Sequence, residues 1–126
     1  MRVKLGVAVT TVVALLLGMI VTADAASVRV RCEKRTNRSK ISVDGFGLGA
    51  GSFTARATSG PNTATSGAKN SVAGEAEFDF DSDAGDVAEG ATRISPTFIQ
   101  GNTVTGAILS GGNVVASATA TCRVKN

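Results

Sequence analysis

The sequence predicts an all-β domain with about seven short antiparallel strands in an immunoglobulin-like two-sheet sandwich. Apolar and polar residues alternate with a period of two along most of the chain, and Gly-, Asn- and Ser-rich turn signals separate the alternating segments. After the N-terminal apolar run, no segment shows a helical period. The core Trp of a true immunoglobulin domain is missing, so a small Greek-key barrel is the alternative.

A secretory signal peptide is predicted over residues 1–25. A basic start precedes an apolar run over residues 5–21, and Ala23 and Ala25 supply the small residues that a signal peptidase reads. Cleavage after Ala25 leaves a single domain, residues 26–126, that is secreted or periplasmic and has no membrane span. An uncleaved anchor is the alternative, because the apolar stretch is about long enough to cross a bilayer.

The two cysteines, Cys32 and Cys122, are predicted to form a disulfide between the first and the last strand. Each occupies the apolar phase of its strand, as in Val28, Val30 and Cys32, and therefore faces inward. A redox-active or metal-binding pair is the alternative, but the chain has no C-x-x-C motif. The bond would close a loop of about 90 residues, for which chain-entropy estimates are about 4–5 kcal/mol.

The first hairpin is predicted from strands over 27–35 and 38–44, joined by a two-residue turn at Thr36 and Asn37. One register satisfies both the apolar phase and the charges. Its four cross-strand pairs are Val30 with Val43 and Cys32 with Ile41 inside, and Arg29 with Asp44 and Glu33 with Lys40 outside.

The middle of the chain is predicted to contain two further strands, over 52–58 and 72–81. A long polar loop over 59–71 separates them and is expected to be the most flexible segment. An acidic, Gly-containing turn over 82–91 follows the second of these strands. The inward residues are Phe53, Ala55 and Ala57 on the first strand and Ala76, Phe78 and Phe80 on the second.

The last third is predicted to be a three-stranded meander over 92–100, 103–109 and 114–125, with turns at Gly101-Asn102 and Gly111-Gly112. Pro96 makes the first of these an edge or bulged strand.

The register of the last hairpin has a consequence for its outer face. Placing Val114 and Ala116 inward also places their partners Ala107 and Leu109 inward. An apolar outer cluster then remains as a candidate partner-binding edge, consisting of Val104, Ile108 and Val115. A covering loop and a different register are the alternatives.

The acidic stretch over 75–89 contains seven acidic residues and no basic one. Five of them are candidate calcium ligands, because the first three have the spacing of a calcium loop and the turn can bring in the others. They are Asp79, Asp81, Asp83, Asp86 and Glu89. The match fails at Ala84 and Gly90, where such a loop has Gly and a bidentate Glu. A solvated or salt-paired strand face is therefore the favoured interpretation.

The basic segment over 26–40 holds six Lys and Arg residues against Glu33 alone. Removing Arg2, Lys4 and Asp24 from the 13 basic and 10 acidic residues leaves 11 and 9, a net charge of +2. That small charge, with no interleaved aromatic residues, argues against nucleic-acid binding. If the two charged strands are sheet neighbours, the bases pair with the acids. If they are distant, the bipolar surface suits head-to-tail association or anionic envelope polymers.

The missing residue types limit the chemistry. With no His, the chain cannot form Ser-His-Asp or Cys-His catalytic sets or His-bound metal sites. The Gly-rich run over 45–51 lacks the Lys and the helix of a phosphate-binding loop. We therefore expect an exported non-catalytic domain without a cofactor, with a structural or protein-interaction role that involves a protein partner or self-association. A calcium-dependent binding module that uses residues 79–89 is the alternative.

Overall fold

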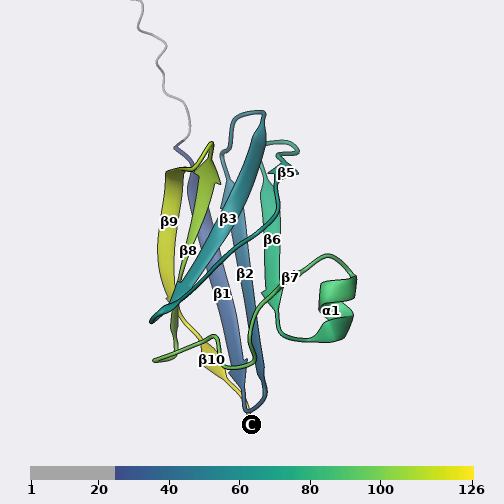
Figure 1. Ribbon diagram of the computed structural model, residues 1–126. Helices are drawn as coiled ribbons and strands as arrows, with labels where there is room; N and C mark the ends of the chain where they lie inside the picture. Colours follow the sequence, from purple (N-terminus) through teal and green to yellow (C-terminus); the bar gives the residue numbers. More distant parts are fainter. Residues whose placement is uncertain (1–24) are drawn as a thin grey trace, which may run out of the picture.

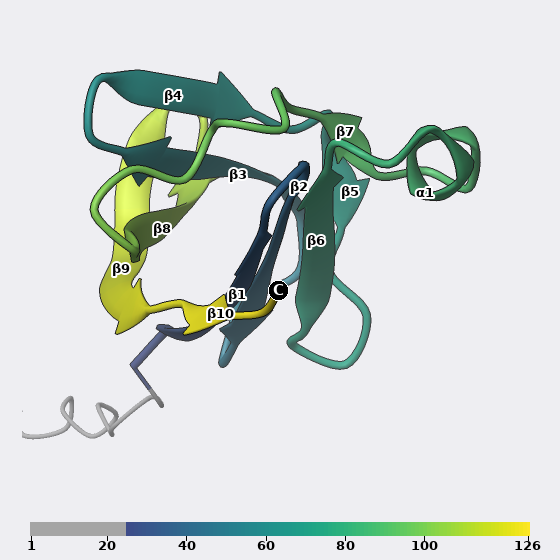
Figure 2. The ribbon, with the colours of Figure 1, turned by 90° about the horizontal axis from the view of Figure 1, so that it is seen from below.

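The computed structural model describes residues 25–126, so the signal peptide predicted over 1–25 lies almost wholly outside the described residues. The described residues form two packed β-sheets and one short helix (Figure 1). Figure 2 looks along the strands and shows the sheets as separate layers, with helix α1 (Ala84–Ala88) outside them. The predicted all-β two-sheet sandwich is confirmed.

The ten strands of the described residues divide equally between the two sheets. Sheet one has the order β10-β1-β2-β6-β7, and sheet two has the order β4-β3-β8-β9, with β5 also paired to β3. The strands of sheet one are β1 (Ser27–Arg35), β2 (Arg38–Phe46), β6 (Ala76–Asp81), β7 (Thr92–Arg93) and β10 (Arg123–Val124). Those of sheet two are β3 (Ser52–Ser59), β4 (Asn62–Thr65), β5 (Lys69–Asn70), β8 (Thr103–Ser110) and β9 (Asn113–Thr121). Among the strands of residues 25–126, only β7 and β10 pair in parallel, with β6 and β1 respectively.

The β1–β2 hairpin has the predicted register. The four predicted pairs are all present: Arg29 with Asp44, Val30 with Val43, Cys32 with Ile41, and Glu33 with Lys40. Strand β2 continues to Phe46, two residues beyond the predicted end. Turn, apolar phase and charge all specify the same pairing here, which explains why local sequence sufficed.

Residues 59–71 are not the polar loop that the sequence predicts, because they form β4 and β5. Gly60 has a φ of +56°, which lets the chain reverse directly after β3. The alternating Thr63-Ala64-Thr65 then pairs back along β3. Four residues of β4 were too short a segment to stand out from a turn-rich sequence.

The predicted strand start at residue 72 is also wrong, because β6 begins at Ala76. Val72 and Glu75 pair across a tight turn instead. Within it, Ala73 and Gly74 have left-handed φ angles of 53° and 79°. An Ala in this conformation is uncommon, so the sequence carried no Asn-Gly type of signal for the turn.

The acidic turn predicted over 82–91 contains the helix α1. Asp83 caps it, since its Oδ2 accepts a hydrogen bond from the backbone N–H of Asp86 at 3.1 Å. Five residues are too few for a helical period to be visible in the sequence. Within residues 25–126, no helix has both the length and the apolar character to cross a membrane.

The strand predicted over 92–100 ends after β7, at Arg93. Pro96 cannot donate to a strand ladder, and the chain turns there, with the Phe98 N–H donating to the Ser95 carbonyl at 3.0 Å. The apolar residues of this segment still enter the core between the sheets, including Phe98 and Ile99.

A β-bulge in the β8–β9 hairpin changes the predicted faces of β8. Ile108 lies opposite Ala116 instead of Val115, which becomes the extra residue of the bulge. A shift by one residue moves side chains to the opposite face. Val104 and Ile108 are therefore core residues, 1% and 0% exposed. The predicted apolar edge of Val104, Ile108 and Val115 is wrong, and only Val115 lies on the surface.

The core has bulky side chains on sheet one and small ones in the middle of sheet two. Sheet one contributes Val30, Ile41, Val43, Phe78 and Phe80, whereas the facing part of sheet two contributes Ala55, Ala57, Gly106 and Ala118. A Cβ on Gly106 would lie 2.7 Å from Val30 Cγ2 and 2.9 Å from Val43 Cγ2. The sheets approach closely at this point because Gly106 has no side chain.

The predicted disulfide between Cys32 and Cys122 is present, with the two Cα atoms 4.6 Å apart. Cys32 belongs to β1, and Cys122 lies where the chain passes from β9 in sheet two to β10 in sheet one. The single long strand predicted over 114–125 is thus two strands in different sheets. The bond fixes this crossing to the first strand.

Candidate functional site

The outer face of sheet one gathers the charged side chains of the first hairpin and of β6. Side chains alternate along a strand, and β2 pairs with both β1 and β6, so charged residues fall into rows across the sheet. The rows are Arg29–Asp44–Glu77, Arg31–Ser42–Asp79 and Glu33–Lys40–Asp81. The basic hairpin and the acidic strand are therefore neighbours, as internal charge pairing requires.

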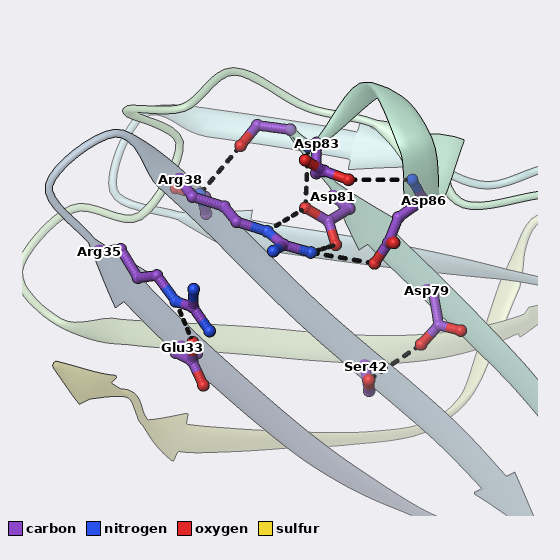
Figure 3. A network of polar contacts seen from close by, with 10 residues as sticks. Glu33, Arg35, Arg38, Ser42, Asp79, Asp81, Asp83 and Asp86 are labelled. Atoms are coloured by element: carbon purple, nitrogen blue, oxygen red, sulfur yellow. Dashed lines mark hydrogen bonds and ion pairs between the residues drawn. The ribbon is translucent and has the colours of Figure 1, made fainter. Parts of the chain in front are cut away.

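Arg38 and Asp81 form a bidentate ion pair at one end of this face (Figure 3). Nε of Arg38 donates to Asp81 Oδ1 at 2.9 Å, and Nη2 donates to Oδ2 at 2.7 Å. Asp81 is 1% exposed and also accepts from the backbone N–H of Asp83 at 2.9 Å. The same Nη2 donates to Asp86 Oδ2 at 3.0 Å. One guanidinium thus holds two carboxylates.

These contacts move the pKa values of the two carboxyl groups in opposite directions. Burial alone would raise the pKa of Asp81, but hydrogen bonds from Arg38 and from the backbone of Asp83 lower it to about 2. The hydrogen bond with Asp81 raises the pKa of Asp86, because a protonated Asp86 can donate to its ionised neighbour. The hydrogen bond with Asp81 also raises the pKa of Arg38. The Arg38–Asp81 pair therefore stays ionised at neutral pH, as a structural ion pair does.

Asp44 neutralises two arginines of β1 at once. Nη2 of Arg31 donates to Asp44 Oδ2 at 3.0 Å, and Nη2 of Arg29 lies 3.7 Å from the same oxygen. The Asp44 side chain is 5% exposed, whereas both arginine side chains are more than half exposed. Two cations share one carboxylate, which leaves an excess of positive charge along β1.

Glu33 is the other acidic residue of the first hairpin and pairs with Arg35, as Figure 3 shows. The hydrogen bond from Arg35 lowers the pKa of Glu33, and the more distant Lys125 and Arg123 add to the effect. Exposed pairs of this kind contribute about 0–1 kcal/mol to stability.

The structure does not gather the five candidate calcium ligands into one site. Arg38 occupies Asp81 and Asp86, and Asp79 accepts a hydrogen bond from Ser42 Oγ at 2.9 Å. The remaining two lie at the ends of α1, with Asp83 as its N-cap and Glu89 as its C-cap. Among residues 25–126, no group of three or more His, Cys, Asp or Glu side chains is arranged to hold a metal ion.

Two open grooves adjoin on the outer face of sheet one and share Arg31, Lys40 and Ser42. The first, of about 390 Å³, lies at the β1 edge, and the second, of about 650 Å³, extends toward α1. The first is lined by Val30, Arg31, Cys32, Glu33, Lys40, Ser42, Thr121 and Arg123. The second is lined by Arg31, Lys40, Ser42, Lys69, Asp79, Asp86, Glu89, Gly90 and Ala91. The β1 end is therefore basic and the α1 end mainly acidic.

Lys40 and Arg123 are candidate binding residues. The sequence predicts Lys40 on the outer face, opposite Glu33, but it does not single out Arg123. Within the described part of the chain, neither forms an ion pair. The alternation of apolar and polar residues in β2 was the sequence signal for the outward position of Lys40. Arg123 joins it only because the chain changes sheets at Cys122, for which the sequence has no local signal.

Comparisons with protein-family models, with curated proteins and with solved structures found no match to this chain.

Proposed function

We propose that residues 1–25 export the chain and are removed, and that residues 26–126 act as a non-catalytic sandwich domain in the periplasm, the cell envelope or the extracellular space. Its role is structural or protein-binding. The observation that carries the proposal is the Cys32–Cys122 disulfide, because such bonds persist in oxidising compartments and are rare in the cytosol. The N-terminal charge and apolar pattern agrees with the same route.

The strand order supports an immunoglobulin-like topology within the sandwich. Strands β1, β2 and β6 correspond in order to A, B and E of that fold, and β4, β3, β8 and β9 to C′, C, F and G. The sandwich differs from an immunoglobulin domain in two respects. Within residues 25–126 no strand corresponds to D, and the disulfide joins the first strand to the end of the last instead of B to F.

A non-catalytic role is supported by how the carboxylates are used. Asp81 and Asp44 are the buried ones, and each is held in ion pairs by arginine. Asp86 has a raised pKa, but its side chain is 40% exposed and is bound to the same guanidinium as Asp81. A general acid needs a free proton near a bound substrate, whereas Asp44 and Asp81 join neighbouring strands and Asp86 joins α1 to β2.

A protein-binding role is supported by positive charges that the internal ion pairs do not neutralise. The β1 side of sheet one keeps Lys40 and Arg123 without an ion pair in the described residues, next to a groove. Charged grooves of this kind contribute specificity and association rate to complexes.

The proposal is tested by expressing the full chain with its own N-terminus and analysing the protein outside the cytoplasm. N-terminal sequencing is expected to start at Ala26, and thiol titration is expected to find no free thiol. A matched variant, Ala25→Leu, should retain the N-terminal segment, because the peptidase requires a small residue there. A chain that stays in the cytoplasm, or begins at Met1, contradicts export. A strictly monomeric exported protein with no co-purifying partner contradicts the binding role.

A further inference from the structure

The free edge of β1 is the surface that the structure assigns to partner binding, and we infer that it takes up an extended acidic peptide by strand addition. The inference rests on the proposed protein-binding role and names its partner chemistry. It depends on three features of the β1 edge: unpaired backbone groups, an adjoining groove and an excess of positive charge.

The backbone of β1 is unpaired on one side along its first five residues. Strand β10 pairs with Glu33 and Lys34, and Cys122 lies beside Cys32, which leaves 27–31 without a strand partner on that side within the described structure. The Lys34 carbonyl accepts from the Lys125 N–H at 2.8 Å, so Lys34 directs its backbone groups away from β2. Alternate residues of an antiparallel strand do the same. Val28 and Val30 therefore direct their amides and carbonyls toward this free edge, whereas Cys32 is covered by its disulfide partner Cys122, whose Cα lies 4.6 Å away.

The groove of about 390 Å³ lies beside this edge. Val30 and Cys32 lie on its β1 side, and Thr121 and Arg123 line it from the crossing between β9 and β10. A strand added here would continue the line of β10 along β1. Main-chain hydrogen bonds would then supply affinity, and alternate side chains would supply selectivity.

The charges around this edge specify an acidic partner. Four cations, Arg29, Arg31, Lys40 and Arg123, lie on or beside it. The two carboxylates nearby, Glu33 and Asp44, are already held by arginines. The outward side chains of an added strand at positions i and i+2 would lie next to Arg29 and Arg31. Carboxylates at alternate positions of an extended peptide match this arrangement.

The other sheet edges are less suited to such a partner. On β6, Nζ of Lys69 donates to the Glu77 carbonyl at 2.7 Å and so occupies the edge. On β4, the side chain of Asn62 donates to the Phe98 carbonyl at 2.8 Å. Strand β9 has nine residues and none of them is charged, so it offers no charge to select a partner.

The test measures binding of a short end-capped peptide that alternates Glu with Thr, by fluorescence anisotropy on the exported, disulfide-bonded protein. The same peptide with Gln in place of Glu is the neutral control. The Glu peptide is expected to bind about tenfold or more tightly than the Gln peptide, and Lys40→Gln with Arg123→Gln should remove most of that difference. Neither residue forms an internal ion pair in the described residues, so the double variant should fold.

A second pair of variants separates strand addition from simple charge attraction. Val28→Pro removes an amide that points away from β2, so the β1–β2 ladder is kept, whereas the added strand loses a donor. Val28→Ala loses the same side-chain packing but retains the amide. Val28→Pro is expected to weaken binding about tenfold, and Val28→Ala by less than about twofold. Thermal unfolding of both variants checks that they are folded.

Three outcomes would overturn the inference: no binding of the Glu peptide, equal effects of the two Val28 variants, or full competition by inorganic polyphosphate together with insensitivity to Val28→Pro. The last would indicate a general polyanion site. The binding tests use only protein whose mature N-terminus and lack of free thiols have first been verified, so any of these results refutes the edge as the binding surface and leaves the export proposal standing.

Discussion

The two sheets of this sandwich differ in the size of their inward side chains and in the charge of their outer faces. Sheet one has bulky residues inside and paired charges outside. Sheet two has small residues in the middle of its inner face and an outer face that carries threonines in register across four strands. One such row consists of Thr63, Thr58, Thr105 and Thr119, and Thr105 and Thr119 share a hydrogen bond at 2.7 Å.

In this domain of about 100 residues, sheet one supplies the bulky side chains in the middle of the core and the charged contacts, and sheet two supplies a close-packed facing layer with few charges. Phe78 and Phe80 of sheet one fill the interior. Sheet two has only a hydrogen atom at Gly106, where Val30 and Val43 of sheet one approach it. The neighbouring Ala57 adds only a methyl group. Threonine pairs stabilise the outer face of sheet two without charge. Specific electrostatic contacts are concentrated on sheet one. We therefore expect substitutions in sheet one to affect both stability and partner recognition. Substitutions in sheet two should affect stability alone, through the packing of the core.

The largest effect is expected from Phe80→Ala, which removes a fully buried ring from sheet one. The free energy of unfolding should fall by about 3–5 kcal/mol. Ala57→Gly, at a fully buried position of sheet two, should lower it by only about 1 kcal/mol. Urea unfolding of both variants measures the difference. Equal losses would show that the two inner faces share the core more evenly than their side chains suggest.

Arg38→Met is expected to lower the free energy of unfolding by about 2–4 kcal/mol, because it leaves the Asp81 carboxylate buried without its partner. Arg35→Met is the matched control, since it breaks the exposed pair with Glu33 and should change stability by less than about 1 kcal/mol. Denaturant unfolding at neutral pH compares the two. A loss for Arg38→Met as small as for the control would mean that Asp81 finds other partners.

The same ion pair predicts how stability depends on acid. The pKa of Asp81 is about 2 in the folded protein and near 3.8 when it is unperturbed. Its stabilising contribution, about 2–3 kcal/mol, is fully present above about pH 5 and is lost as the pH falls through the unfolded pKa toward 2. Protonation of Asp86, whose pKa is raised, offsets part of the loss. Unfolding measured across this range should show a shallower slope for Asp81→Asn than for the wild type, and identical slopes would refute the assignment.

Gly106→Ala is expected to destabilise the fold by about 1–3 kcal/mol, since its Cβ would overlap Val30 and Val43 of the facing sheet. Gly67→Ala is the control, because a Cβ there would meet nothing within 4 Å. Thermal unfolding distinguishes the two variants. A neutral Gly106→Ala would show that the sheets can separate at this point without loss.

Sequence patterns predicted those parts of the fold in which several local signals agree. The β1–β2 register had a turn, an apolar phase and two charge pairs in its favour. The bulge at Val115 had none, because an uninterrupted alternation and a Gly-Gly turn look the same with or without one extra residue. The faces of β8 were therefore assigned wrongly, although its position in the chain was right.

The sequence predicted that the candidate site contains charge pairs between neighbouring strands, but not which residues form them. The opposite charges of the first hairpin and of the acidic strand indicated pairing between neighbours, and β2 and β6 are neighbours. That Asp81 is the buried partner depends on Arg38 and on the cap formed by Asp83, and α1 is too short to be seen in the sequence. The free edge of β1 depends on how far β10 extends, which is decided by the chain crossing at Cys122.

Amide hydrogen exchange along β1 in the free, disulfide-bonded protein tests the central claim most directly. If the first half of β1 is an open edge, the amides of Val28 and Val30 exchange fast, while those of Arg29 and Arg31, which face β2, are protected. Adding the acidic peptide should then slow the exchange of Val28 and Val30. Uniform protection along β1 without any peptide would contradict the account, because the edge would already be covered.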